Sequence, residues 1–475
     1  MVDGLAARNG GRVGLAALVA ILLLGFGLRV GEAWDGRAPV YDAAAYAAIA
    51  ANLERGEGFT VGAGATQPSS NYSPGLPLFV AGVYEVTGGA HERLARLTLA
   101  LLGTLAVLLT YLLGRRLARW VHFPRPGKEN RTSAADVVAG LIGAAAVAVY
   151  PALLEYQGML MSEPLAATLL AGAVLAMLWA RDGGALPRWI LPGALLGALA
   201  LVRPEYLGVT VLLALAVLAG ALFGTPTAPG ASARPDRRVP RDGWGASLAA
   251  AAVLLLSALV VVAPWTIRNA EALGRFVPIS TGGGQVLFAG TYLPSDGNPE
   301  RVGAEVVERH PDLFGPNAVQ RLRLEQILAR LAADRYSDLE TDQALAKMGR
   351  EQFWDDLGEP LEYAGFLAKK VWRLWGHGPR DVMQAPAWVL LHWALVAFGL
   401  LGLGLLAWRR RWEALVLATV FVAITALSAL LVASPRRVLA MLPLLAACAG
   451  VGVTGAWAAL RERRRPGEAG AASAG

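Results

Sequence analysis

Long apolar stretches divide this chain, and they constrain its fold more strongly than any other feature. A helix needs roughly 20 mostly apolar residues to cross a bilayer. Because backbone polar groups in hydrocarbon must be satisfied internally, such stretches become helices. About ten stretches meet this criterion, at residues 12–30, 93–114, 134–151, 163–180, 187–203, 206–223, 244–265, 386–408, 413–433 and 438–459. The sequence therefore predicts an all-α polytopic membrane protein with about ten transmembrane helices.

The composition supports this fold class and excludes several others. Charged residues make up 17% of the chain and hydrophobic residues 55%, whereas a soluble domain has about 25% charged residues. This excludes a disordered chain and a coiled coil. The net charge of +7 comes from short basic runs between apolar stretches, so we expect no nucleic-acid partner. The single cysteine, Cys448, lies in an apolar run, where it fits the role of a small apolar filler.

Basic clusters indicate which ends of the spans face the cytoplasm, because Lys and Arg are enriched in cytoplasmic loops. Four clusters stand at 115–131, 234–241, 409–411 and 461–465. With ten spans, all four lie on the same side as the N-terminus. We expect a multi-pass protein of the plasma membrane with cytoplasmic N- and C-termini. The first apolar stretch resembles a signal peptide, but its long core lacks a clear cleavage site, so we interpret it as a retained anchor.

In this topology two long segments lie outside the cytoplasm, at residues 31–92 and 266–385. The second is acidic, since residues 270–385 hold 17 Asp and Glu against 13 Lys and Arg. Apolar residues at helical spacing predict helices within 318–350 and after Pro360. The expected organisation is a transmembrane module 1–265 that contains the outer loop 31–92, an extracytoplasmic segment 266–385, C-terminal transmembrane helices 386–460 and a disordered cytoplasmic tail 461–475.

The first outer loop carries the carboxylate of greatest interest. Residues 40–59 are rich in alanine, which favours a helix, and Gly56 would end it. The apolar positions form one stripe, so this helix should lie along the membrane surface. A second interfacial helix is predicted after the proline-rich turn at Pro74. Asp42 stands at the start of the first helix, where it either caps the helix or serves as a general base at the membrane–water boundary.

More ionisable residues gather at the predicted outer ends of the spans, where a charge is costly without a partner or a function. Glu163 suits either the positive end of a helix or a catalytic site. Arg203 and Glu205 suit either a local ion pair or a substrate site. Arg268 suits either snorkelling to the lipid headgroups or contact with a ligand.

Arg436 and Arg437 break the positive-inside pattern, because the ten-span topology places them outside. Guanidinium groups match phosphate in shape. A carboxylate base opposite such groups predicts transfer from a lipid-phosphate donor, with the departing charge stabilised by arginine. The candidate site comprises Asp42 and Glu163 as catalytic residues, and Tyr72, Arg203, Glu205, Arg268, Asn269 and Arg436 as substrate-binding residues.

Several blocks of sequence follow one another in a distinctive order. They are Y-D-A-A-A-Y-A-A-I-A-A-N-L-E-R-G-E-G-F, S-P-G-L-P-L-F, M-S-E-P-L, L-V-R-P-E-Y-L, A-P-W-T-I-R-N-A-E-A-L-G-R-F-V-P-I-S-T-G-G-G and P-R-R-V-L-A-M-L-P-L-L-A. Their order resembles the GT-C superfamily of polyprenyl-phosphate-sugar-dependent glycosyltransferases, in the branch of the protein O-mannosyltransferases and lipid A aminoarabinose transferases. The resemblance implies that Asp42 is the catalytic base and that Glu163 organises the acceptor or the site. It also implies that Arg268 and Arg436 face the donor phosphate.

The resemblance also implies the partners: a polyprenyl-phosphate-linked sugar donor, an envelope glycan, lipid or protein acceptor, and the bilayer itself. One position departs from the family pattern. The family often has a second acid after the first, and here Ala43 follows Asp42. Glu57 is a candidate substitute. Metal use varies in this family, so a divalent metal stays an open alternative to a metal-free site.

Two other functions fit the same pattern of spans. A transporter or lipid flippase would show inverted repeats and charges at the bilayer midplane, but here the ionisable residues gather at one face. A catalytically inactive relative that acts as a scaffold would explain the missing acid after Asp42. Covalent transfer that depends on Asp42 separates an enzyme from both alternatives.

Overall fold

The computed structural model describes residues 2–36, 38–40, 42–62, 68–121, 133–223, 243–315, 317–322, 324–332, 338–376, 378, 381–409 and 411–463. These residues form helices and no strand. The longer α-helices are α1 (Val2–Trp34), α2 (Asp42–Glu54), α3 (Gly75–Thr87), α4 (Glu92–Val121), α5 (Ala134–Val149), α7 (Glu163–Gly183), α8 (Ile190–Val202), α9 (Glu205–Ala219), α10 (Trp244–Leu273), α15 (Asp338–Asp356), α16 (Pro360–Gly376), α17 (Pro386–Trp408), α18 (Trp412–Leu430) and α19 (Val438–Arg463). The shorter ones are α6 (Pro151–Gly158), α11 (Gly283–Thr291), α12 (Val302–Arg309), α13 (Ala318–Arg321), α14 (Leu324–Leu331) and the 3₁₀ turns η1 (Leu186–Trp189), η2 (Gly220–Phe223), η3 (Leu293–Ser295), η4 (Asp381–Gln384) and η5 (Pro435–Arg437).

Among the described residues, eight helices are long and apolar enough to cross a membrane, and a ninth span forms if the bent pair α5 and α6 is counted. The pair bends by 46° at Tyr150, which separates the two helices. The predicted span 187–203 is a shorter apolar helix, Leu186–Val202, which starts as a 3₁₀ turn. Each predicted stretch therefore has a helical counterpart, and the chain is an all-α, multi-pass membrane protein.

One predicted boundary is wrong. The seventh span was expected to end at residue 265, but α10 continues through Pro264 as far as Leu273. Proline is tolerated inside a membrane helix because neighbouring groups satisfy the freed carbonyl. The helix ends instead at Gly274, whose φ of +66° favours glycine. Arg268 and Asn269 therefore project from a regular helix and not from a loop.

The helix α19 lies at the centre of the bundle, with 89% of its most apolar window buried. Small residues allow other helices to approach it closely. A side-chain carbon at Gly402 would lie 2.0 Å from the carbonyl oxygen of Cys448, and one at Gly450 would lie 2.0 Å from that of Ala139. Cys448 is buried and unpaired, which confirms its predicted place in the core.

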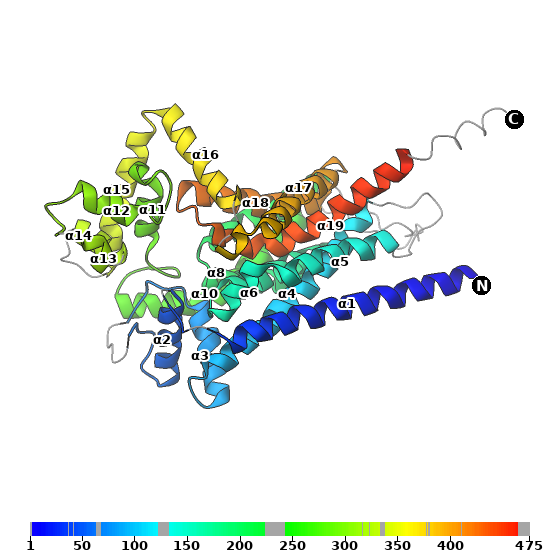
Figure 1. The fold of residues 1–475 in the computed structure, drawn as a ribbon, viewed down its shortest axis with the longest axis horizontal. Helices are drawn as coiled ribbons and strands as arrows, with labels where there is room; N and C mark the ends of the chain where they lie inside the picture. Colours follow the sequence, from blue (N-terminus) through cyan, green and yellow to red (C-terminus); the bar gives the residue numbers. More distant parts are fainter. Residues whose placement is uncertain are drawn as a thin grey trace.

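The bundle separates two ends of the molecule. Figure 1 shows the start of α1 and the end of α19 at one end, and α2, α3 and the helices α11–α16 at the other. The start of α1 and the end of α19 therefore lie at the same end of the bundle. Which side faces the cytoplasm stays a prediction.

The segment between α10 and α17 has an apolar core of its own, built around Phe288, Val302, Val306 and Ile327. The predicted helical stretch 318–350 contains α13, α14 and the first part of α15, and α13 ends at Leu322, which adopts an extended conformation. The helix predicted from Pro360 is confirmed as α16. Of the predicted tail 461–475, residues 464–475 lie outside the described part of the chain.

A buried lysine on α16 ties this outer segment to the bundle. Lys370 is 1% exposed, and its Nζ donates hydrogen bonds to the carbonyl oxygens of Gly290 at 2.6 Å and of Leu431. Gly290 belongs to α11 and Leu431 follows α18, so one ammonium group joins three elements. Burial, assisted by the nearby charge of Arg437, lowers the pKa of Lys370 to about 7.

This lowered pKa predicts that the outer segment becomes more stable as the pH rises above 7. Between pH 7 and 10 the unfolded segment binds more protons at Lys370 than the folded one, so the free energy of unfolding increases with pH. The gain is at most about 1.4 kcal/mol per pH unit. Pulse proteolysis in urea should therefore show a higher midpoint at pH 9 than at pH 7.5. A Lys370→Met variant should lose this difference, and an unchanged pH dependence in the variant would assign it to other groups.

Candidate functional site

Asp42 and Arg436 meet at the end of the bundle that carries α2 and α3. Asp42 begins α2, and its Oδ2 accepts a hydrogen bond from Nη2 of Arg436 at 2.7 Å. Arg436 lies in η5, the short turn that leads into α19. The side chain of Asp42 is 36% exposed and that of Arg436 is 31% exposed. Both groups are therefore partly accessible, and Asp42 has a partner far along the chain in addition to its place at the start of α2.

Glu163 stands behind this pair and is fully buried, with 0% of its side chain exposed. Its Oε1 lies 3.1 Å from Nε of Arg436 and 3.2 Å from Nη1 of Arg203. Nε of Arg203 also donates to Oε1 of Glu205 at 3.1 Å. The five side chains thus form one continuous series of ion pairs. A buried carboxylate is tolerated only with such partners, so Glu163 fixes the positions of both arginines.

Prolines shape the backbone beside these charges: Pro164 at the start of α7, Pro204 before α9 and Pro435 in η5. A residue that precedes proline is driven out of the helical region. Arg203 accordingly has an extended backbone, with φ of −143° and ψ of 101°, where α8 ends. The two helices α8 and α9 therefore meet at a sharp turn that carries the buried charges.

Arg437 adds a third guanidinium group, which the sequence pattern marked only as an exception to the positive-inside rule. It interacts electrostatically with Glu205, Arg203 and Arg436. Its Nη1 is buried and has no hydrogen-bond partner among the described residues. We define the charged cluster as the carboxylates Asp42, Glu163 and Glu205 together with the guanidinium groups Arg203, Arg436 and Arg437. Three negative charges balance three positive ones.

Two tyrosines border the charged cluster. Tyr46 follows Asp42 by one helical turn and is buried, and burial together with the charge of Asp42 raises the pKa of its hydroxyl. The ring of Tyr72, a predicted substrate-binding residue, packs edge-on against Tyr46 with centroids 5.9 Å apart. The structure thus brings Tyr72 to the same side of α2 as the charged cluster. Tyr46 is one of the apolar positions of this helix, yet its hydroxyl adds a polar group near Asp42.

Arg268 and Asn269 occupy a different position. Arg268 donates to the carbonyl oxygens of Ser69 at 3.1 Å and of Phe59 at 3.4 Å, and its guanidinium stacks on the rings of Trp265 and Phe59. Asn269 is fully buried and donates to the backbone of the segment after α10. In this structure Arg268 holds the first outer loop and Asn269 holds the segment after α10. Within the described part of the chain, Arg268 forms no ion pair with the carboxylates of the charged cluster.

Glu57, the candidate substitute for the missing second acid, does not join the cluster. It follows the far end of α2, a helix of 13 residues that is about 20 Å long. Glu57 is exposed and paired with Arg55 at 3.0 Å. The second acid near Asp42 is instead Glu163, which comes from α7.

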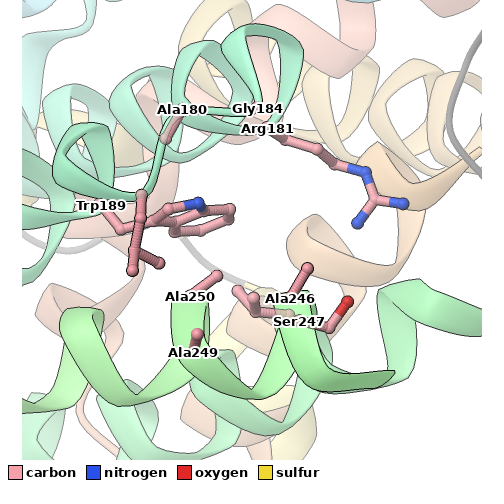
Figure 2. Close-up of a pocket in the computed structure, with 10 residues that line it drawn as sticks. Ala180, Arg181, Gly184, Trp189, Ala246, Ser247, Ala249 and Ala250 are labelled. Carbon is pink, nitrogen blue, oxygen red and sulfur yellow. The ribbon is translucent and has the colours of Figure 1, made fainter. Parts of the chain in front are cut away.

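Two cavities in the described part of the chain lie away from the charged cluster. Figure 2 shows one of about 170 Å³, lined by Arg181, Trp189 and Ser247 among others. Arg181 lies at the C-terminal end of α7 and Glu163 at its start, about 27 Å apart along the helix. A larger cavity of about 530 Å³ lies at the outer ends of α1 and α6. It is lined by the carboxylates of Glu32, Asp35, Glu155 and Asp381. Such a lining repels a phosphate group, so the arginines of the charged cluster are better placed to bind one.

The carboxylates of the charged cluster are already paired with guanidinium groups. Within the described ranges, no group of three or more His, Cys, Asp or Glu side chains is arranged to hold a metal ion. No step below depends on a metal ion.

Neither the known family models nor the curated proteins include a significant match to the sequence. Solved structures do match. The oligosaccharyltransferase AglB from Archaeoglobus fulgidus, in complex with an inhibitory peptide and a dolichol-phosphate, has a TM-score of 0.53 and 16% identity, covering 95% of this chain and 51% of that chain. The same organism's oligosaccharyltransferase with Zn and sulfate gives a TM-score of 0.53 and 16% identity over 94% and 50% of the two chains.

A third match is ArnT from Cupriavidus metallidurans bound to undecaprenyl phosphate, with a TM-score of 0.38 and 15% identity over 92% and 77% of the chains. This chain spans about half the length of the oligosaccharyltransferases it matches. The likeness to them shows that its helices follow the fold of a membrane oligosaccharyltransferase, as the GT-C-like fold class predicted.

Proposed function

We propose that this protein is a membrane glycosyltransferase of the GT-C type, which transfers a sugar from a polyprenyl-phosphate donor to an acceptor on the extracytoplasmic face. The observation that carries the proposal is the partly exposed pair of Asp42 and Arg436, held from behind by the buried Glu163. A base and a phosphate-binding group stand within one hydrogen bond of each other. The fold, shared with a structure that contains dolichol-phosphate, supports a lipid-linked donor.

In the proposed reaction, Asp42 accepts the proton of an acceptor hydroxyl as that oxygen attacks the anomeric carbon of the donor sugar. The bond between this carbon and the phosphate oxygen breaks, and the electron pair stays with the phosphate. Arg436 stabilises the charge of the departing polyprenyl phosphate. The products are the glycosylated acceptor, the polyprenyl phosphate and a protonated Asp42, which then releases its proton to water.

Exposure separates two roles within the charged cluster. Asp42 and Arg436 are accessible and act on substrate, whereas Glu163 and Arg203 are buried and act as positioning residues. Arg437 offers a buried N–H group without a partner, which a second phosphate oxygen would satisfy. The outer segment covers this end of the bundle, where it is tied to the chain before η5 through Lys370.

The test of this function uses purified protein in liposomes and a panel of polyprenyl-phosphate sugars, with crude envelope supplied as acceptor. We expect release of free polyprenyl phosphate and transfer of labelled sugar to acceptor from at least one donor. Nucleotide sugars should give no transfer, because they lack the lipid carrier. Movement of lipid or solute across the liposome without covalent transfer would contradict the proposal and favour the transporter. Absence of both activities would favour the inactive scaffold.

A further inference from the structure

The helix α16 has an exposed apolar side. Residues Tyr363, Phe366, Lys370 and Leu374 are buried against the rest of the protein. On another side, Lys369 and Arg373 pair with Asp296 in the turn after η3. The remaining side consists of Leu361, Ala364, Gly365, Ala368 and Trp372, all exposed. We refer to these five residues as the α16 stripe.

The α16 stripe is continuous in both sequence spacing and chemistry. At 3.6 residues per turn its members lie within about 100° of one another around the helix. Leu361 is 89% exposed and Trp372 is 56% exposed. A helix with one apolar side and a separate charged side is typical of segments that lie in the membrane interface. Tryptophan is enriched at that depth because its ring is apolar and its N–H is polar.

The α16 stripe joins the lipid-facing surface of the bundle. The ring of Trp372 packs against that of Trp393 on α17, with centroids 5.6 Å apart. The helix α17 is a membrane span with only 28% of its most apolar window buried, and Leu390 on it is 72% exposed. Figure 1 shows α16 slanting away from the bundle beside α17 and α18. The contact of Trp372 with Trp393 therefore joins the exposed apolar side of α16 to a membrane-spanning helix.

We propose that the α16 stripe lies in the outer leaflet of the bilayer, so that lipid and not a second protein covers it. The charged side of α16 stays with the outer segment through Asp296, and the buried side carries Lys370. Membrane attachment of one side of α16 thus fixes the outer segment relative to the chain that leads into Arg436. This inference concerns the lipid surface and does not depend on the proposed transferase activity.

Spin labelling in proteoliposomes tests this inference. Only one native cysteine has to be replaced before labels are attached at chosen positions. In a Cys448→Ala background, nitroxide labels are placed at Leu361→Cys and Ala368→Cys on the α16 stripe. Glu362→Cys, one residue along the same helix and off the stripe, is the matched control. The vesicles contain phosphatidylcholine and phosphatidylglycerol, and the measurement compares collision with oxygen, which concentrates in lipid, and with a water-soluble nickel chelate.

We expect the two stripe labels to collide several-fold more with oxygen than with the nickel chelate, relative to the Glu362→Cys label. Stripe labels that collide mainly with the nickel chelate would place α16 in water and overturn the proposal. Low collision with both reagents would show that protein covers the α16 stripe, and this too would overturn it. Because each label reports its own surroundings, the result does not require catalytic activity.

Discussion

We expect an Asp42→Asn variant to lose the release of polyprenyl phosphate by a factor of about 10²–10⁴, the range typical of a positioned general base. The substitution keeps the shape of the side chain and one oxygen that accepts the hydrogen bond from Arg436. The protein should therefore fold and bind its donor as the wild type does, while the acceptor hydroxyl keeps its proton. Initial rates in proteoliposomes, with donor binding measured separately, distinguish these two effects.

Glu57→Gln is the matched control for this experiment. It changes a carboxylate in the same outer loop, but one that is exposed, paired with Arg55 and distant from the charged cluster. We expect its rate to stay within about twofold of the wild type, because surface ion pairs contribute little. A fully active Asp42→Asn protein would remove Asp42 from the mechanism. Loss of activity in the control would instead point to the loop as a whole.

Hydropathy and local spacing predicted most of the elements around the site. The spans follow from lengths of apolar sequence, and the interfacial helices α2 and α3 follow from an alanine-rich run and a proline-rich turn. Arg436 attracted notice because the ten-span topology places it outside, whereas arginines are enriched in cytoplasmic loops. These features are local, so a single sequence reveals them.

The partners within the site could not be predicted in the same way. Asp42 and Arg436 stand 394 positions apart, and no periodicity relates two residues at that separation. The pairing depends on how α2, α7 and α19 pack, which sequence spacing does not encode. For the same reason Arg268 was expected at the donor phosphate, whereas its neighbours in the fold are the carbonyl oxygens of Ser69 and Phe59.

Lys370 illustrates a second limit. Lysine is rarely buried, and the sequence pattern of α16 does not distinguish Lys370 from its neighbour Lys369. The helix turns these two neighbours about 100° apart, so Lys369 is exposed while Lys370 is buried against two carbonyl oxygens. Only the tertiary contacts of α11 and α18 decide which of the two faces inward.

The other large effect should follow from Arg436→Met, which removes the guanidinium group between Asp42 and Glu163. Glu163 is completely buried, and leaving a buried carboxylate uncompensated costs about 3–5 kcal/mol of folding free energy. Because Arg203 still pairs with Glu163, we expect a loss below that range. The departing phosphate also loses its nearest positive charge. We therefore expect both a lower thermal stability in detergent and loss of transfer activity in the protein that remains folded.

Arg411→Met separates these two effects because it removes a comparable buried ion pair at the other end of α18. Arg411 pairs with Glu413 at 3.3 Å, and the side chain of Glu413 is only 3% exposed. We expect Arg411→Met to lower stability as well, yet to keep the activity per folded molecule. If both variants lost activity in proportion to stability, Arg436 would have only a structural role.

A double variant, Glu163→Gln with Arg436→Met, provides the complementary comparison. Neutralising the buried carboxylate removes the charge that Arg436 compensates, so a large part of the lost stability should return, as a double-mutant cycle measures directly. Transfer should stay absent, because the donor phosphate still has no guanidinium group beside Asp42. Recovery of activity together with stability would show that Arg436 serves the fold alone and would shift phosphate binding to Arg203 or Arg437.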